Sequence, residues 1–126
     1  MAKIVPQLKS APTPLAPYSV VTEAGGLLFI SGQVPMGIDD GATPDGIEAQ
    51  TELVMANIGT LLSDLGLGFD DVVKTTIFLT DMDDYGTVNE IYGRAFETEP
   101  PARSAVGVAA LPKPEFLIEV ELIAAR

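Results

Sequence analysis

One long helical pattern, flanked by segments that favour β-strands, constrains this chain most. Residues 47–65 carry apolar side chains at helical spacing, and Gly66 and Gly68 end the pattern. At its start, Asp45 and Glu48 have the three-residue separation of a capping box. A helix with one apolar face must bury that face against another element. The apolar positions are Ile47, Val54, Ile58, Leu61, Leu62 and Leu65.

Strand-like segments lie on both sides of this helix. Before it, residues 18–22 and 27–31 flank a Glu-Ala-Gly-Gly turn at 23–26 and predict a hairpin. The second strand is expected to stop at residues 32–35, which contain a glycine and a proline. After the helix, the apolar and β-branched residues 72–79 predict a largely buried strand.

The last third of the chain predicts a second helix and two more strands. Asp81 begins an acidic run suited to a helix N-terminus, and the helix is expected to continue to about Glu97. The two prolines at 100–101 force a break, after which residues 102–108 and 116–124 favour strands. The apolar stripe of this second helix consists of Tyr85, Val88, Tyr92 and Phe96.

The resulting order, β-β-α-β-α-β-β, predicts an α+β fold in a single domain over residues 1–126. Residues 1–17 are expected to be extended, because their prolines lack backbone donors. Helices on one face leave the other face of the sheet to be covered by something else. In a chain of 126 residues that cover is most easily a second copy of the same chain. The prolines are Pro6, Pro12, Pro14 and Pro17.

Composition and charge exclude several classes of function. The chain has no cysteine and no histidine, which excludes thiol and imidazole catalysis, disulfides and the usual zinc or copper ligands. Its net charge of −11 opposes binding to nucleic acids and to anionic membranes. The N-terminal residues lack the apolar core of a signal peptide, and no apolar run is long enough to span a bilayer. We therefore expect a cytoplasmic protein.

Arg103 is an unusual residue for its segment, because residues 102–110 are otherwise small or apolar. A guanidinium at such a position needs an anion. That anion can be a neighbouring carboxylate in a structural ion pair. It can equally be a ligand whose carboxylate accepts two parallel hydrogen bonds from the guanidinium.

Two acids, Glu119 and Glu121, lie in the last predicted strand. Because side chains alternate along a strand, both share one face with Leu117 and Ile123. Both acids can simply face solvent on a half-exposed strand. Alternatively, one of them lines a partly dry pocket as an acid or a base. The opposite, core-facing side chains are Phe116, Ile118, Val120 and Leu122.

Four further residues stand at positions where a structural and a functional role both fit. Asn89 lies on the aromatic stripe of the second helix, where its amide makes either a structural hydrogen bond or a ligand contact. Tyr18 opens the first predicted strand, where a tyrosine usually packs. Ser31 and Gly32 end the second strand, and a glycine suits a turn there.

Several motifs together resemble the RidA family, the reactive intermediate deaminases also called YjgF-like proteins. The Pro-Ala-Arg-Ser stretch at 101–104 and the Ile-Glu-Val-Glu stretch at 118–121 are specific signals, whereas Ser-Gly-Gln at 31–33 alone is weak. The resemblance begins at Ala16 and covers nearly the whole chain. The other matching segments are residues 16–19, 30–35, 73–79 and 88–92.

The resemblance implies a fold, an assembly and an activity. The implied fold is chorismate-mutase-like, a mixed sheet with two helices on one face, assembled as a homotrimer with a central β-barrel and a pocket at each subunit interface. The implied activity is hydrolysis of 2-imino acids, such as 2-iminobutanoate and 2-iminopropanoate, or of their enamine tautomers. The products are 2-oxo acids and ammonia, and no metal or organic cofactor is needed.

The resemblance also implies roles for individual residues. By position in the family pattern, Arg103 binds the substrate carboxylate and Glu119 positions or activates the attacking water. Because alternation leaves Glu121 equally possible, only the family position favours Glu119. The residues implied to shape the pocket are Tyr18, Ser31, Gly32 and Asn89.

One position departs from the family pattern. Family members with strong deaminase activity usually carry a cysteine two positions after the arginine, where this chain has Ala105. The resemblance implies that the backbone at this position contributes to the pocket, so alanine keeps that contact and enlarges the space. Gly107, where relatives often carry a charged residue, is expected to add room nearby.

Two other functions fit part of the pattern. A non-enzymatic trimer that binds a small carboxylate as a sensor, or covers hydrophobic surfaces as a chaperone, would keep Arg103 and make Glu119 dispensable. A ribonuclease or translation inhibitor is an activity attached to some relatives, and the net charge of −11 opposes it.

Overall fold

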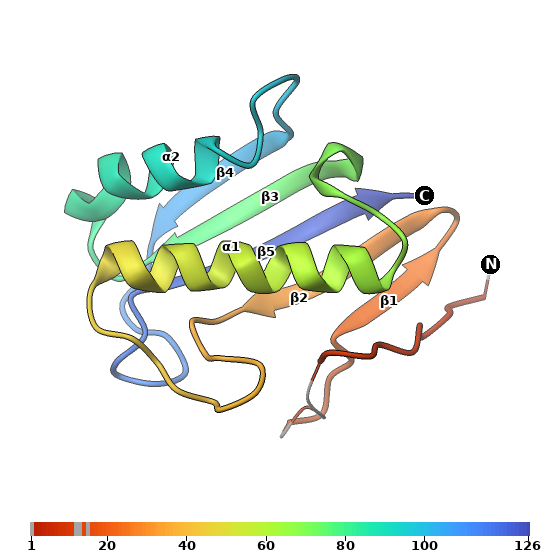
Figure 1. The fold of residues 1–126 in the computed structure, drawn as a ribbon, viewed down its shortest axis with the longest axis horizontal. Coiled ribbons are helices and arrows are strands. Elements are labelled where there is room, and N and C mark those ends of the chain that lie inside the picture. The colour runs from red at the N-terminus through yellow and green to blue at the C-terminus, as the bar shows by residue number, and fades with distance from the viewer. Residues whose placement is uncertain (1, 12–13, 15) are drawn as a thin grey trace.

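The structure, a computed structural model, describes residues 2–11, 14 and 16–126. Within these residues the chain forms a five-stranded sheet and two α-helices (Figure 1). One-turn 3₁₀ helices at Phe69–Asp71 and Met82–Asp84 precede β3 and α2. The elements are β1 (Val21–Ala24), β2 (Leu27–Gln33), α1 (Ile47–Asp64), β3 (Val72–Leu79), α2 (Tyr85–Gly93), β4 (Ala102–Gly107) and β5 (Ile118–Ala125).

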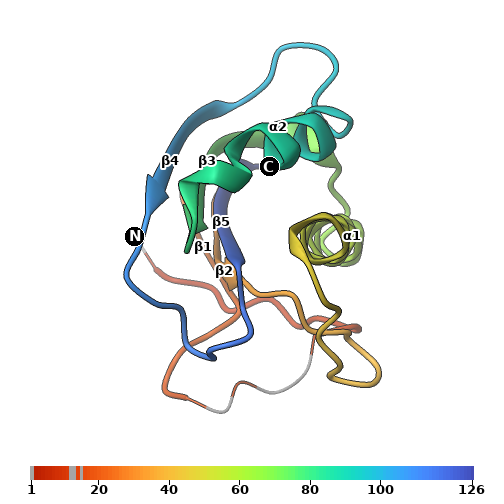
Figure 2. The same cartoon turned by 90° about the vertical axis from the view of Figure 1, so that its left-hand side faces the viewer.

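The sheet is mixed, in the order β1-β2-β5-β3-β4. The pairs β1–β2, β2–β5 and β5–β3 are antiparallel, whereas β3 and β4 are parallel and joined through α2. Both helices lie on the same side of the sheet (Figure 2). The predicted α+β fold, its element order and its one-sided helical cover are confirmed.

The core lies between the helices and one face of the sheet. In β5, Ile118, Val120 and Leu122 are almost fully buried. Of the acids that alternate with them, Glu119 is half-buried and Glu121 is exposed. The predicted division of this strand into an apolar and a polar face is therefore confirmed. From the helices, the buried residues Val54, Ile58, Leu61, Leu62, Val88 and Tyr92 complete the core.

The opposite face of the sheet has no helix over it in Figure 2. It carries Phe29 of β2 and Val106 of β4, which are 43% and 41% exposed. These are two separate exposed apolar positions, because β5 and β3 lie between β2 and β4. This is the face for which a second cover was expected.

Several element boundaries differ from those predicted. The first strand begins at Val21, so Tyr18 precedes it. The second strand continues past Ser31 to Gln33 through a bulge, because Ile30 pairs with Leu122 and Gln33 with Val120. The last strand begins at Ile118. Pro12, part of the predicted extended segment, lies outside the described residues.

The helix ends differ from prediction for local reasons. Helix α1 has Gly46 as its N-cap, with φ of 88°, and no side chain caps it, so the predicted capping box of Asp45 and Glu48 is wrong. Helix α2 ends at Gly93, short of the predicted Glu97. Phe96 still packs as predicted from the stripe, with its ring centroid 4.7 Å from that of Tyr92. The aromatic contact therefore does not require the residue to be helical.

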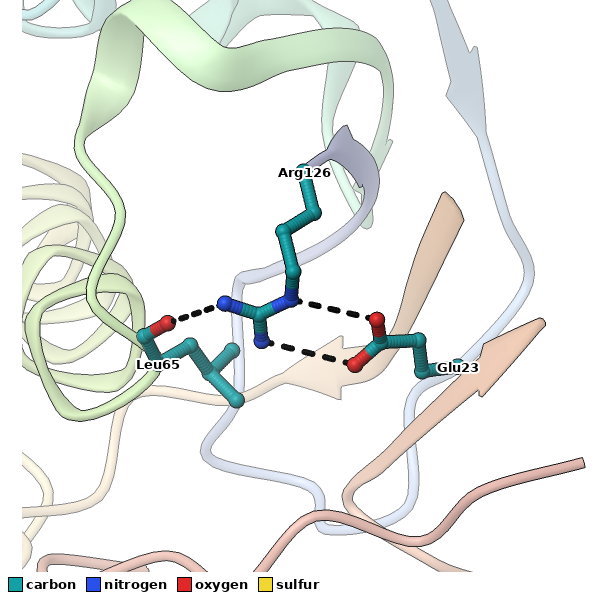
Figure 3. Close-up of polar contacts among 3 residues, drawn as sticks. All are labelled: Glu23, Leu65 and Arg126. Carbon is teal, nitrogen blue, oxygen red and sulfur yellow. Dashed lines mark hydrogen bonds and ion pairs between the residues drawn. The ribbon is translucent and has the colours of Figure 1, made fainter. Parts of the chain in front are cut away.

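Arg126 joins three parts of the fold (Figure 3). Its Nε and Nη2 lie 3.1 and 3.4 Å from the carboxylate oxygens of Glu23, and Nη1 donates to the carbonyl of Leu65 at 2.9 Å. Leu65 is the C-cap of α1, whose last turn has no basic residue of its own. The guanidinium therefore supplies a cation at the negative end of this helix dipole.

No described helix is both apolar enough and long enough to cross a membrane.

We predict that Arg126→Met lowers the free energy of unfolding by about 1–2 kcal/mol, because a hydrogen bond to a carbonyl, an ion pair and a dipole interaction are lost together. Urea denaturation measures the change. The matched control, Glu23→Gln, removes only the ion pair and should cost less than about 1 kcal/mol. Equal losses in the two variants would contradict the contribution of the helix end.

Candidate functional site

Arg103 lies in β4 on the face of the sheet that the helices cover. Its partner in the parallel ladder is Thr75 of β3, whose side chain is buried beneath α2. The guanidinium Nη1 donates to Oδ1 of Asn89 at 2.8 Å, and Nη2 donates to the hydroxyl of Tyr85 at 2.8 Å. Both acceptors belong to α2 and lie one helical turn apart, so the helix positions the guanidinium.

Two aromatic rings also contact this guanidinium. Its Cζ lies 5.5 Å from the ring centroid of Tyr85 and 5.1 Å from that of Tyr92, distances typical of cation–π contacts. The hydroxyl of Tyr92 shares a 2.7 Å hydrogen bond with Oγ1 of the buried Thr75, which fixes the ring. Burial raises the pKa of Tyr92, so this phenol stays neutral.

The charge of Arg103 has no anionic partner among the described residues. Among the described residues, the ion pair that the structure contains joins Arg126 and Glu23, away from Arg103. Every group that holds Arg103 is therefore uncharged, and two of its five N–H donors are used. The structural ion pair considered from the sequence is absent from the described part of the chain, and the half-buried cation can accept an external anion.

Glu119 lies on the opposite, helix-free face of the sheet. It pairs with Phe78 of β3, while its neighbours Ile118 and Val120 point into the core. The pKa of Glu119 is raised, first by burial of the carboxyl and second by the like charge of Glu121. Glu121 is exposed, so the two acids occupy different environments although they share a face.

The side chain of Glu119 lies directly over Gly32. A Cβ at residue 32 would collide with the Glu119 carboxyl group, whose Cδ lies 2.7 Å from the position of that Cβ. The glycine therefore leaves the space that the carboxylate occupies. Next to it, Oγ of Ser31 donates to the carbonyl of Ser19 at 2.7 Å, which ties the bulge of β2 to the segment before β1.

Two hollows lie near Gly32 and Ser31. Tyr18, which is 54% exposed, and Gly32 line a mostly apolar hollow of about 360 Å³, whose wall includes Leu61. A hollow of about 400 Å³ on the helix-free face is lined by Glu121 and Lys74 instead. Neither contains Arg103 or Glu119, so within one chain neither hollow is a complete site.

The candidate residues thus form two groups on opposite faces of the sheet. Arg103 and Asn89 are in contact beneath α2, and Ala105 follows Arg103 on the same face. Glu119 and Gly32 are in contact on the other face. One chain does not bring Arg103 and Glu119 together, because the sheet lies between them. Tyr18 and Ser31 lie with the second group, near Gly32.

The space expected at Gly107 is filled. The Cγ and Sδ of Met82 lie 3.1 and 3.7 Å from where a Cβ at residue 107 would stand. The glycine therefore admits a methionine side chain, and the expectation of extra room there is wrong. Ala105 is half-buried and packs against the edge of the core.

Tyr85 is the residue of this site that sequence reasoning missed. Its aromatic ring suggested a place in the packed stripe of the second helix, yet it is 38% exposed and contacts Arg103. Its position four residues before Asn89 was the available signal, because residues so spaced share a helix face.

Among the described residues, the acidic side chains form no group of three that could hold a metal ion.

The chain is similar to known proteins over almost its entire length. A family model described as endoribonuclease L-PSP matches residues 8–126. AldR from Lactococcus lactis, whose name proposes a regulator, is 47% identical and the match covers 97% of this chain and 96% of AldR. The mouse 2-iminobutanoate/2-iminopropanoate deaminase is 41% identical, with 92% of this chain and 86% of the mouse protein covered.

The fold also matches solved structures over nearly the whole chain. A protein of the Rid family from Yersinia pestis, YyfA, is 43% identical and matches with a TM-score of 0.92, over 99% of this chain and all of that one (100%). TdcF from Escherichia coli, solved with bound serine, is 35% identical and has a TM-score of 0.87, over 95% of this chain and 96% of TdcF. By sequence along its length and by its fold, this chain belongs to the endoribonuclease L-PSP family, the Rid family that includes the reactive intermediate deaminases.

Proposed function

We propose that the protein hydrolyses 2-imino acids, or their enamine tautomers, to 2-oxo acids and ammonia. The observation that carries this proposal is the guanidinium of Arg103, which only uncharged groups hold and which has no anionic partner in the described part of the chain. A substrate carboxylate is the anion that it accepts, through two parallel hydrogen bonds. The name of the mouse relative supports 2-iminobutanoate and 2-iminopropanoate as substrates.

The complete site in this proposal needs two copies of the chain. Arg103 and Asn89 of one copy meet Glu119 and Gly32 of a neighbour, because one chain holds these groups on opposite faces of its sheet. The helix-free face, with the exposed Phe29, supplies an apolar surface for this association. A homotrimer whose sheets surround a central barrel satisfies both requirements and makes three equivalent sites.

The reaction needs only positioning and proton transfer. Water adds to the carbon of the protonated imine and gives a proton to the acid–base group, which passes it to the nitrogen of the carbinolamine. Ammonia then leaves, and the hydroxyl loses its proton to solvent as the carbonyl forms. One water is consumed and one ammonia released for each 2-oxo acid. Orientation by Arg103 and one acid–base group can supply the modest help that this easy reaction requires, without a metal or organic cofactor.

Glu119 is the acid–base group in this proposal. Its ionised form accepts a proton from the attacking water and returns it to the nitrogen of the carbinolamine. Burial and the neighbouring charge of Glu121 raise its pKa, which makes the carboxylate a stronger base than an exposed one. In the proposed site, Ala105 of one copy and Tyr18 and Ser31 of its neighbour form the remaining walls of the pocket.

A second candidate is a binding module without catalysis. The serine bound to TdcF favours it, because a relative holds a small amino acid there, and the name of AldR describes a regulator and not an enzyme. This function keeps the requirement for Arg103 and removes that for Glu119. The endoribonuclease in the family name is disfavoured for this chain, because a net charge of −11 repels RNA.

Paired variants test the deaminase directly. Glu119→Gln should lower kcat by about 10²- to 10⁴-fold, because the acid–base group is lost while the shape is kept. Its matched control, Glu121→Gln, should retain most of the activity. Arg103→Met should raise KM, because the carboxylate loses its partner. The assay measures 2-oxo acid and ammonia released from imines generated in situ.

Two outcomes would contradict this assignment. Full activity in Glu119→Gln together with loss in Glu121→Gln would move the acid–base role to Glu121. Binding of 2-oxo acids that depends on Arg103, without any hydrolysis by the wild type, would favour the binding module.

The raised pKa of Glu119 predicts a specific pH dependence. Because the ionised carboxylate is the active form, kcat/KM should fall as the pH drops through this pKa. Glu121→Gln removes the like charge, lowers the pKa of Glu119 towards its ordinary value and shifts the acid limb to lower pH. A pH–rate profile, with ¹³C NMR titration of the Glu119 carboxyl, measures the shift. An acid limb that stays in place or moves to higher pH would contradict it.

A further inference from the structure

Tyr85 makes a contact that the proposed chemistry does not yet use. It is the first residue of α2, and its hydroxyl accepts a hydrogen bond of 2.8 Å from Nη2 of Arg103. Its ring also lies against the same guanidinium, with the centroid 5.5 Å from Cζ. A tyrosine whose only role is packing would bury its ring, yet Tyr85 is 38% exposed.

We propose that Tyr85 is a positioning residue that holds the Arg103 guanidinium in the orientation needed to bind a carboxylate. This inference rests on the proposed function, since it assigns to Tyr85 the affinity of that same site for 2-oxo and 2-imino acids. Tyr85 acts through Arg103 and is not a catalytic residue. Its effect is on the affinity for the carboxylate and not on the proton transfers.

The geometry explains why one acceptor is insufficient. A hydrogen bond from Nη1 to Asn89 fixes one corner of the planar fork and leaves the plane free to turn about that bond. The second bond, from Nη2 to Tyr85, fixes another corner, and both acceptors stand on one face of α2. With two donors used, three N–H groups remain, enough for two parallel bonds to a carboxylate.

The chemistry of the acceptors also matters. An acidic residue in place of Tyr85 would neutralise the guanidinium and compete with the ligand. A phenol hydroxyl accepts the bond without adding a charge, so the cation keeps its attraction for an external anion. The second ring on the guanidinium, from Tyr92, lies 5.1 Å from Cζ, and its hydroxyl is already bonded to Thr75. Tyr85 is therefore the tyrosine whose hydroxyl orients Arg103.

Titration calorimetry of the purified oligomer with pyruvate, and with the neutral analogue pyruvamide, tests this role. Tyr85→Phe keeps the ring and removes only the hydroxyl, so pyruvate should bind about 5-fold more weakly, as expected for the loss of one hydrogen bond. The affinity for pyruvamide should not change. In the Arg103→Met background, Tyr85→Phe should have no further effect on pyruvate, because the hydroxyl acts through the guanidinium.

In turnover assays, the same substitution should raise KM for the imine about 5-fold and leave kcat within about 2-fold of the wild type. A merely structural role would lower kcat or weaken both ligands together. Equal weakening of pyruvate and pyruvamide therefore overturns the proposal. Unchanged or tighter binding of pyruvate overturns it as well, because the hydroxyl would then be idle or would compete with the ligand.

The failure of this inference is distinguishable from the failure of the proposed function. If Arg103→Met abolishes pyruvate binding and Tyr85→Phe does not weaken it, only the role of Tyr85 is wrong. If the wild type does not bind pyruvate, or if Arg103→Met binds it equally well, the carboxylate site itself is wrong and the role of Tyr85 is overturned with it.

Discussion

The alternation of side chains across a single sheet is the constraint on which the rest of this structure depends. In β5 it places Ile118, Val120 and Leu122 in the core and turns Glu119 to the other side. The same register carries across β3 to β4, where Arg103 shares the helix-covered face with Thr75. Moving β5 by one residue would exchange its faces and turn Glu119 and Glu121 into the core. The need for a core therefore also separates the two charged candidate residues.

This separation connects folding with function. A guanidinium and a carboxylate within reach of each other on one face of the sheet would form an ion pair, and neither would then be free for a ligand. The sheet keeps them apart, so the charge of Arg103 stays unpaired among the described residues, and burial raises the pKa of Glu119. In the proposed assembly the two groups meet only across an interface between copies. Association would then create the site.

Sequence patterns predicted much of this fold, because periodicity reports which face of an element is buried. The helix at residues 47–65, the faces of β5 and the contact between Phe96 and Tyr92 all follow from it. The ends of elements were harder to predict. The cap of α1 depends on the loop geometry at Gly46, which the spacing of Asp45 and Glu48 does not report.

The candidate site was predictable in its charged residues and less so in their surroundings. Arg103 stands out in an apolar segment, whereas the exposure of Tyr85 and its contact with Arg103 depend on how α2 is placed beside β4. The methionine that fills the space at Gly107 lies far from it in sequence, in the turn before α2. Such contacts depend on tertiary packing, and no local pattern encodes them.

Subunit complementation tests most directly whether one site takes residues from two copies of the chain. Arg103→Met and Glu119→Gln chains, each expected to be nearly inactive alone at substrate concentrations below KM, are co-expressed in equal amounts, and mass spectrometry checks that the oligomers contain both. With random assembly, about one quarter of the interfaces join an intact Arg103 to an intact Glu119, so about one quarter of wild-type activity should return. Mixed oligomers that remain as inactive as their parents would contradict a site shared between chains.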